Sequence, residues 1–325
     1  MRVVVDAMGA DRGPDEIVAG ALEAASDSIT PVVVGDAALD AHGLELVPST
    51  EVIAMDEKPA EAVRTKGDAS LVVACNILAE GHADALVSPG NTGALLAAGL
   101  LRLRRLPSVF RPALAVPIPT KRGPSVLIDA GANAEARPEH LLQFGHMGSV
   151  FAEEILEVEM PEVRLLSIGE EAEKGNQLTL DAHALLEQSD LRFAGNTESR
   201  GLLAGAADVV VCDGFTGNVC LKLLEGTIKT VLDSLREEIT ATPRGKAGGF
   251  LIRPAARRLR SRLDPDTYGG AYLLGLRSLV VKAHGNSSRR AIANAIRLAA
   301  RGVDHRVVER LSERLPERRS AARAV

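Results

Sequence analysis

Aromatic residues are scarce in this sequence: its 325 residues include no tryptophan, two tyrosines and six phenylalanines. Proteins that bind single-stranded nucleic acids stack the bases on aromatic side chains, so this scarcity argues against that class of function. The formal net charge of -5 argues in the same direction, because a general binder of polyanions carries an excess of positive charge. We therefore expect no nucleic-acid partner.

Metal ligands in suitable positions are also missing. The three cysteines, Cys75, Cys212 and Cys220, form no CxxC pair, and no histidine is placed to complete a zinc site. No group of Asp, Glu and His residues has the spacing of metal ligands either. We therefore expect the cysteines to pack as small apolar residues, and the protein to use no metal and no other cofactor.

Long hydrophobic runs are absent as well. No apolar stretch approaches the roughly 20 residues that a membrane-spanning helix needs. The first residues, MRVVVDAMGAD, follow a strand pattern without a cationic leader. The expected compartment is the cytoplasm, with peripheral contact on the inner face of the cell membrane through a basic segment described below.

Three motifs of common α/β enzymes do not occur. The sequence has no GxSxG nucleophile elbow, no GxGxxG after its first strand and no GxxxxGK[ST] phosphate loop. A serine hydrolase, a nicotinamide-dependent enzyme and a P-loop protein are therefore not expected.

What the sequence does contain is a regular alternation of short β-branched runs and helical stretches. Near-continuous apolar strands are covered on both faces, and their alternation with helices is typical of a mainly parallel sheet between helical layers. We predict an α/β fold with one catalytic domain over residues 1–315 and a disordered tail over 316–325. The expected strands cover residues 3–6, 31–35, 84–88, 126–129, 164–167, 208–212 and 279–283, and the expected helices include 138–156, 218–238 and 286–300.

Gly-Asn pairs recur at the ends of these strands, at residues 90–91, 175–176, 195–196, 217–218 and 285–286, and a Gly-Ala-Asn spans 131–133. One such pair is ordinary turn and helix-cap chemistry. Their repetition indicates an anion site, because open α/β sheets bind ligands at the carboxyl ends of strands and such turns aim N–H groups at one point. Phosphate is the anion that we expect to bind there. If phosphate is itself the nucleophile, the protein needs only donors and no covalent side chain.

Eight sequence blocks resemble, in order, those of the bacterial phosphate acyltransferases. They are DAMGAD (6–11), SPGNTGA (88–94), GANAEARPEHLLQFGHMG (131–148), LLSIGEEAEKGN (165–176), FAGNTES (193–199), DVVVCDGFTGNVCLKLLEG (208–226), YGGAYLLG (268–275) and AHGNSS (283–288). The resemblance runs from the first strand to about Ala300. Tyr272 departs from the pattern, since the family commonly has proline there, and this position bears on the shape of the acyl channel.

The resemblance implies an enzyme that transfers a fatty acyl group from acyl-acyl carrier protein to inorganic phosphate. The product, acyl phosphate, is the acyl donor for the first step of phospholipid synthesis, which leads to phosphatidic acid. The resemblance also implies a homodimer with a three-layer α/β/α sandwich similar to isocitrate and isopropylmalate dehydrogenases and to phosphotransacetylase, with a protruding helical hairpin. Near pH 7 phosphate is substantially dianionic, and a thiol with a pKa of about 8.5 is a good leaving group, so positioning and oxyanion stabilisation suffice.

Candidate site residues come from the turns and from these blocks. Lys174, Asn218 and His284 are the candidate catalytic residues. Alternatives remain open: Lys174 as a solvated surface lysine, and His284 as a structural histidine. The candidates for binding phosphate or the acyl donor, some of which are equally good helix caps, are Ser88, Asn91, Thr92, Gly93, Asn133, Asn176, Asn196, Asp213, Lys222 and Ser287.

A basic segment, residues 240–263, carries seven Lys or Arg residues and no acidic residue. From Ile252 its pattern is helical, with an apolar strip and arginines on another face, and we expect a helical hairpin at about 240–265. Such a helix can lie on anionic lipid, receive an acidic carrier protein or pack on a partner subunit. The residues expected to contact membrane or carrier protein are Phe250, Leu251, Ile252, Arg257 and Leu259.

Two other classes of function remain open. One is a metal-dependent dehydrogenase on the same fold, which needs several carboxylates around one ion. The other is a membrane-surface scaffold that only senses phosphate or acyl groups. Phosphate-dependent release of thiol by the purified protein separates all three.

Overall fold

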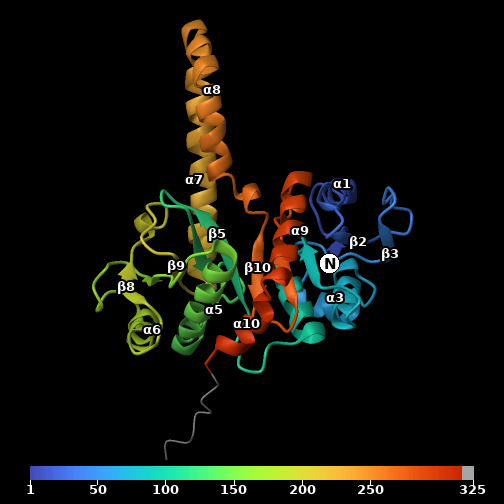
Figure 1. Cartoon of the computed structure of the whole chain (residues 1–325), viewed down its shortest axis with the longest axis horizontal. Coiled ribbons are helices and arrows are strands. Elements are labelled where there is room, and N and C mark those ends of the chain that lie inside the picture. The colour runs from blue at the N-terminus through green and yellow to red at the C-terminus, as the bar shows by residue number, and fades with distance from the viewer. Residues whose placement is uncertain (317–325) are drawn as a thin grey trace, which may run out of the picture.

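The computed structural model describes residues 1–316, and its centre is one sheet of eleven strands (Figure 1). The strand order is β3-β2-β1-β4-β11-β10-β5-β6-β9-β7-β8. The strands are β1 (Arg2–Asp6), β2 (Thr30–Gly35), β3 (Glu45–Pro48), β4 (Ala85–Ser88), β5 (Ala113–Pro119), β6 (Pro124–Ile128), β7 (Val163–Leu166), β8 (Phe193–Thr197), β9 (Val209–Val211), β10 (Ala271–Leu274) and β11 (Leu279–Lys282).

The sheet is less uniformly parallel than expected. Two parallel blocks lie at its two sides, and the pairs β11–β10, β10–β5 and β5–β6 between them are antiparallel. All seven expected strands are confirmed, whereas β3, β5, β8 and β10 were not predicted. In β5 two prolines, Pro117 and Pro119, obscure the strand pattern. They are tolerated because β10 pairs only with Ala113 to Ala115 and leaves the later part of β5 without a neighbour on that side.

Helices cover both faces of the sheet, which confirms the three-layer α/β/α architecture. Along β1, Val3 and Val5 enter one core cluster and Val4 enters the other, as the two-residue period of a strand requires. The first cluster packs under α1 (Pro14–Ala24), α5 (Pro138–Leu156), α6 (Gln177–Glu187), α9 (Arg289–Asp304) and α10 (Val307–Arg314). The second packs under α3 (Ser70–Ala79), α2 (Pro59–Thr65), α4 (Thr92–Ala98) and the base of α7 (Gly214–Thr240).

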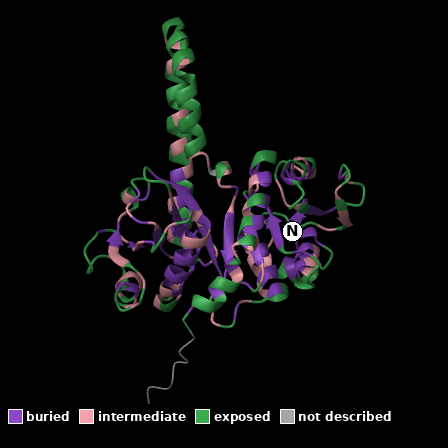
Figure 2. Cartoon of the chain, viewed as in Figure 1, coloured by how far each residue is buried: buried purple, intermediate pink, exposed green. Residues whose placement is uncertain are grey.

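A long hairpin of two helices projects from this body (Figure 1). Its arms are α7 (Gly214–Thr240) and α8 (Pro243–Leu263), and most of its surface is exposed (Figure 2). The prediction of a helix from Ile252 was wrong by nine residues, because α8 begins at Pro243, a residue favoured in the first turn of a helix. The hairpin also extends beyond residues 240–265, since α7 is its first arm.

Glycines allow the two arms to meet closely near their turn. A Cβ at Gly245 would lie 2.2 Å from the carbonyl oxygen of Ile239, and one at Gly249 would lie 2.7 Å from the Ile239 side chain. The first half of α8 was not predicted from the sequence, because glycine has a low intrinsic helix propensity. Within the described residues no helix is both long and apolar enough to cross a membrane. Apart from Pro316, the tail predicted to be disordered lies outside the described residues.

Candidate active site

A cavity of about 200 Å³ lies where the two blocks of the sheet meet, at the base of the hairpin. Its wall comes from segments far apart in the sequence: the start of α4, the later part of β5, the turn after β6, the first turns of α7 and the end of β11. The polar and glycine residues of this wall include Thr92, Gly131, Asn218, Lys222, Glu225, Asp266, Tyr268, Lys282, His284 and Ser287. Thr92, Asn218, Lys222, His284 and Ser287 were predicted site residues, and one cavity brings them together.

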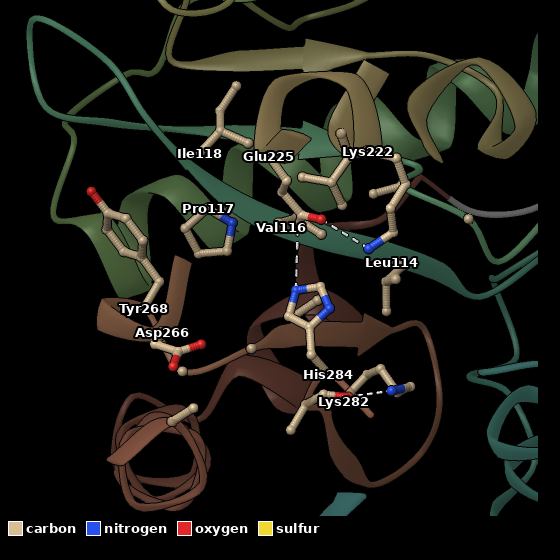
Figure 3. A pocket seen from close by; sticks show the side chains of 18 of the residues that line it. Leu114, Val116, Pro117, Ile118, Lys222, Glu225, Asp266, Tyr268, Lys282 and His284 are labelled. Carbon is tan, nitrogen blue, oxygen red and sulfur yellow. Dashed lines mark hydrogen bonds and ion pairs between the residues drawn. The ribbon is translucent and has the colours of Figure 1, made fainter. Parts of the chain in front are cut away.

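Glu225 joins two of these residues across the cavity (Figure 3). Its Oε2 lies 2.9 Å from Nζ of Lys222, and its Oε1 lies 3.3 Å from Nε2 of His284. Burial opposes the ionisation of Glu225, but the hydrogen bond from Lys222 and the close contact with His284 outweigh this effect and lower its pKa. Glu225 is therefore ionised at neutral pH and orients both partners. Sequence reasoning missed it, although its position one helical turn after Lys222 was a signal.

Lys282, the last residue of β11, is a second residue that sequence reasoning missed. Its side chain is buried, and its Nζ donates to the carbonyl oxygens of Pro89, at 3.2 Å, and Ala283. Burial lowers the pKa of Lys282 to about 8, with help from Lys222 and against the effect of nearby carboxylates. The signal in the sequence was a lysine that closes the apolar run LVVK two residues before His284.

Polar side chains of the turn after β4 fix its position through hydrogen bonds. Buried Ser88 donates to Oδ2 of Asp6 at 2.7 Å. Asn91 caps α4 by accepting the Ala94 N–H at 3.0 Å, and its amide donates to the Met55 carbonyl at 2.9 Å. Of the predicted residues in this turn, Thr92 reaches the cavity wall, whereas Ser88 and Asn91 serve the turn itself. Gly93 packs against another residue: a Cβ there would lie 2.6 Å from the Pro59 ring.

Asn133 and Asp213 also serve local structure. The amide of Asn133 donates to Oδ2 of Asp129 at 2.8 Å and to the Pro112 carbonyl at 2.7 Å, which ties the loop after β6 to the start of β5. Asp213 caps α7 by accepting the backbone N–H of Thr216 at 2.9 Å. These contacts set where Gly131 and Asn218 lie on the cavity wall.

Three predicted residues lie at the outer edge of the sheet, near β7 and β8, and not on the cavity wall. Lys174 is exposed on the loop before α6. Asn176 caps α6 by accepting the Thr179 N–H at 3.0 Å. Asn196 is buried, 2.9 Å from His183 Nδ1, and donates to the Glu171 carbonyl. Within one chain these three residues do not join Lys222 and His284, and their functional role stays a prediction.

An apolar groove of about 1140 Å³ runs along the hairpin and shares Lys222, Glu225, Asp266 and His284 with the cavity. Its apolar wall includes Ile228, Leu232, Leu235, Ile239, Phe250, Ile252 and Leu259, and its basic border includes Lys229, Arg236, Lys246, Arg253, Arg257 and Arg260. Four of the five predicted contact residues line it. The fifth, Leu251, is 79% exposed and lies outside the groove.

Tyr272 does not shape the cavity. It points to the other face of the sheet, where it is buried, its ring packs edge-on against Phe151 at 5.1 Å and its hydroxyl donates to the Leu298 carbonyl. Ala271, its neighbour in β10, faces the cavity instead. In the described part of the chain, no three His, Cys, Asp or Glu side chains are grouped so that they could hold a metal ion.

The α/β/α architecture is also that of solved phosphotransacylases. A phosphotransacetylase from Streptococcus pyogenes aligns with a TM-score of 0.61 over 94% of each chain, at 17% identity. A branched-chain phosphotransacylase from Enterococcus faecalis aligns with a TM-score of 0.60, also at 17% identity, over 93% of this chain and 99% of its own. Likeness at this identity shows the fold alone.

Sequence relatives define the family more closely. The model of the family described as "Fatty acid synthesis protein" matches residues 1–310. The phosphate acyltransferase of Heliobacterium modesticaldum is 45% identical, over 97% of this chain and 98% of its own length. That of Thermosynechococcus vestitus is 46% identical, over 95% and 94%. The chain therefore belongs to the phosphate acyltransferase family, which confirms the resemblance in its motifs, and it is an acyltransferase.

Proposed function

We propose that this protein transfers a fatty acyl group from acyl-acyl carrier protein to inorganic phosphate and so makes acyl phosphate for phospholipid synthesis. The observation that carries the proposal is the cavity whose wall includes Lys222, Lys282 and His284. Cations at one cavity suit an anionic nucleophile, and the apolar groove that begins at the same residues suits a donor with a long acyl chain. Family membership supports the same reaction.

In the proposed reaction, an oxygen of phosphate attacks the carbonyl carbon of the thioester. The new C–O bond forms, negative charge collects on the carbonyl oxygen, and the C–S bond then breaks and releases the carrier's thiolate, which solvent protonates. Asn218 and His284 lie on the cavity wall and are the proposed donors to the carbonyl oxygen. Because this charge appears only as the bond forms, such donors accelerate the chemical step.

The same proposal includes a homodimer. Phe215, Val219 and Leu223 form an exposed apolar strip at the base of α7, which a second copy of the chain would cover. Lys174 lies away from the cavity of its own chain, so a catalytic role for it requires a partner copy. Mixing Lys174→Ala with Lys222→Ala tests this role, because hybrid dimers would regain activity only if each site uses both chains.

We further propose a cytoplasmic protein that binds reversibly to anionic membrane surfaces through its hairpin. Phe250 and Leu251, on α8, are 72% and 79% exposed, and the arginines that follow them carry the complementary charge. An apolar side chain beside basic residues is the usual composition of an interfacial helix. The basic face is also the proposed docking surface for the acidic carrier protein.

Thiol release from acyl-acyl carrier protein tests the reaction. The proposal predicts release that requires phosphate, together with a product that hydroxylamine converts into a hydroxamate, as acyl phosphates do. Activity should persist after exhaustive chelation; its loss, with recovery on addition of a divalent ion, would favour the dehydrogenase-like alternative. A scaffold would release no thiol under any of these conditions.

A further inference from the structure

Lys282 is held in place by neutral partners only. It is 9% exposed, and two of its three ammonium N–H groups reach the carbonyl oxygens of Pro89 and Ala283. Those carbonyls belong to the turns after β4 and β11, and both turns border the cavity. Among the described residues the third N–H group has no hydrogen-bond partner, and Lys282 is part of the cavity wall.

No carboxylate neutralises this buried charge. Within residues 1–316, Lys282 forms no ion pair, and the carboxylates that act to raise its pKa, those of Asp6 and Asp11, do so without a direct contact. Lys222 differs, because it is 56% exposed and already paired with Glu225. An unpaired buried ammonium group is costly, and the lowered pKa of Lys282 reflects this cost. An anion in the cavity would supply the missing partner.

We infer that Lys282 binds the phosphate nucleophile directly, through the ammonium N–H that its two carbonyl partners leave free. The inference rests on the proposed function and assigns its phosphate to one residue. Because the ammonium group is already fixed between two turns, it loses little side-chain freedom when it binds phosphate. It is thereby a preorganised cation at the place where the attacking oxygen must lie, near Thr92 and His284.

The test compares Lys282→Met, which keeps the length and apolar stem, with Lys282→Arg, which keeps the charge. The control is Lys121→Met, an exposed lysine in the turn between β5 and β6. Two quantities are measured for each protein: the KM for phosphate in thiol release, and the shift in melting temperature caused by inorganic phosphate alone.

We expect Lys282→Met to raise the phosphate KM at least tenfold, to leave the KM for the acyl donor unchanged and to abolish the phosphate-induced thermal shift. Lys282→Arg should retain part of the shift, and Lys121→Met should behave as the wild type. A wild-type phosphate KM and thermal shift in Lys282→Met would overturn the inference. The same measurements on Lys282→Gln decide the matter if the methionine variant does not fold.

Failure of the proposed function has a different signature. If the wild type releases no thiol, yet phosphate raises its melting temperature and not that of Lys282→Met, the reaction is wrong and the assignment of Lys282 stands. If phosphate affects neither turnover nor melting of the wild type, both are wrong.

Discussion

At the scale of single residues, the two lysines of the cavity wall differ in how their charge is balanced. Glu225 neutralises Lys222 and holds His284, whereas Lys282 keeps an uncompensated charge. Lys222 therefore belongs to a fixed ion-pair network, whereas Lys282 is the lysine proposed to bind a ligand. This difference gives each residue its own expected response to mutation and to pH.

Glu225→Gln should lower kcat by about 10- to 100-fold with a smaller effect on the phosphate KM. The reason is that the charge-assisted hydrogen bond to Lys222, worth about 1.5–3 kcal/mol, and the charge contact with His284 are lost, which frees both side chains from their orientation. Because the pKa of Glu225 is lowered, the wild type keeps this network until the pH falls below the ordinary range of a glutamate. Steady-state kinetics at pH 7 provide the measurement, with Glu237→Gln, an exposed carboxylate farther along α7, as control. An unchanged kcat would show that Glu225 does not position His284.

Stability should depend on pH through Lys282. Its pKa is about 8 in the folded protein and 10.5 in the unfolded chain, so the unfolded state binds the proton more tightly. The resulting cost, at most about 3 kcal/mol, is fully present below pH 8 and fades as the pH rises to 10.5. Lys282→Met also removes two hydrogen bonds, and it should be less destabilising at pH 7, where it relieves this cost, than near pH 10.5. Urea unfolding at the two pH values measures this, and an equal effect at both would contradict it.

At the scale of elements, turns at strand ends bring the site together, and the hairpin extends it. The turns at Gly9 and Gly90 approach each other so closely that they leave no room for a side chain, since a Cβ at Gly9 would lie 2.7 Å from the Gly90 Cα. On the hairpin, α8 has no buried residue, so its contact with α7 depends on the glycines near the tip. Backbone proximity at Gly245 is the feature most open to test.

Gly245→Ala should loosen the hairpin tip, because its Cβ would meet the Ile239 carbonyl oxygen at 2.2 Å. Gly248→Ala is the matched control: no atom lies within 4 Å of its added Cβ, and alanine favours a helix over glycine by about 1 kcal/mol. Hydrogen exchange over residues 236–250 should therefore speed up in Gly245→Ala and slow down in Gly248→Ala. Equal exchange rates in the two variants would contradict the claim that the close approach of Gly245 to Ile239 stabilises the hairpin tip.

The sequence predicted some of these features and not others, for physical reasons. Alternating apolar runs predicted the layers, and the motif blocks predicted Lys222 and His284. Glu225 was missed because its partner His284 lies on another element, and no local pattern shows contacts between elements. Lys282 was missed because burial of a charged residue depends on the tertiary structure, and β5 because its prolines disguise a strand that lacks one neighbour.

At the scale of the whole molecule, the hairpin projects away from the sheet (Figure 1). It carries exposed apolar residues, and its base borders the cavity. This arrangement would allow the protein to touch a membrane and keep its reaction in water. The groove between the arms links the two regions, since it shares His284 and Lys222 with the cavity.

Leu251→Glu should therefore weaken binding to anionic liposomes at least severalfold, because it places a negative charge at the proposed contact. Met160→Glu is the control, since Met160 is similarly exposed, at 72%, but precedes β7 on the body of the molecule. Co-sedimentation at several salt concentrations measures binding, which should fall as salt screens the arginines. If the wild type does not co-sediment with anionic liposomes, the hairpin serves carrier docking or dimer packing instead.

The central claim is that phosphate itself attacks the thioester and that no acyl group is ever bound covalently to the protein. Exchange of labelled carrier protein into unlabelled acyl-acyl carrier protein tests it most directly, with the purified protein and phosphate strictly excluded. A direct attack predicts no exchange without phosphate, because the C–S bond cannot break until phosphate is present. Exchange at a rate comparable to turnover would require an acyl-enzyme and would contradict the account.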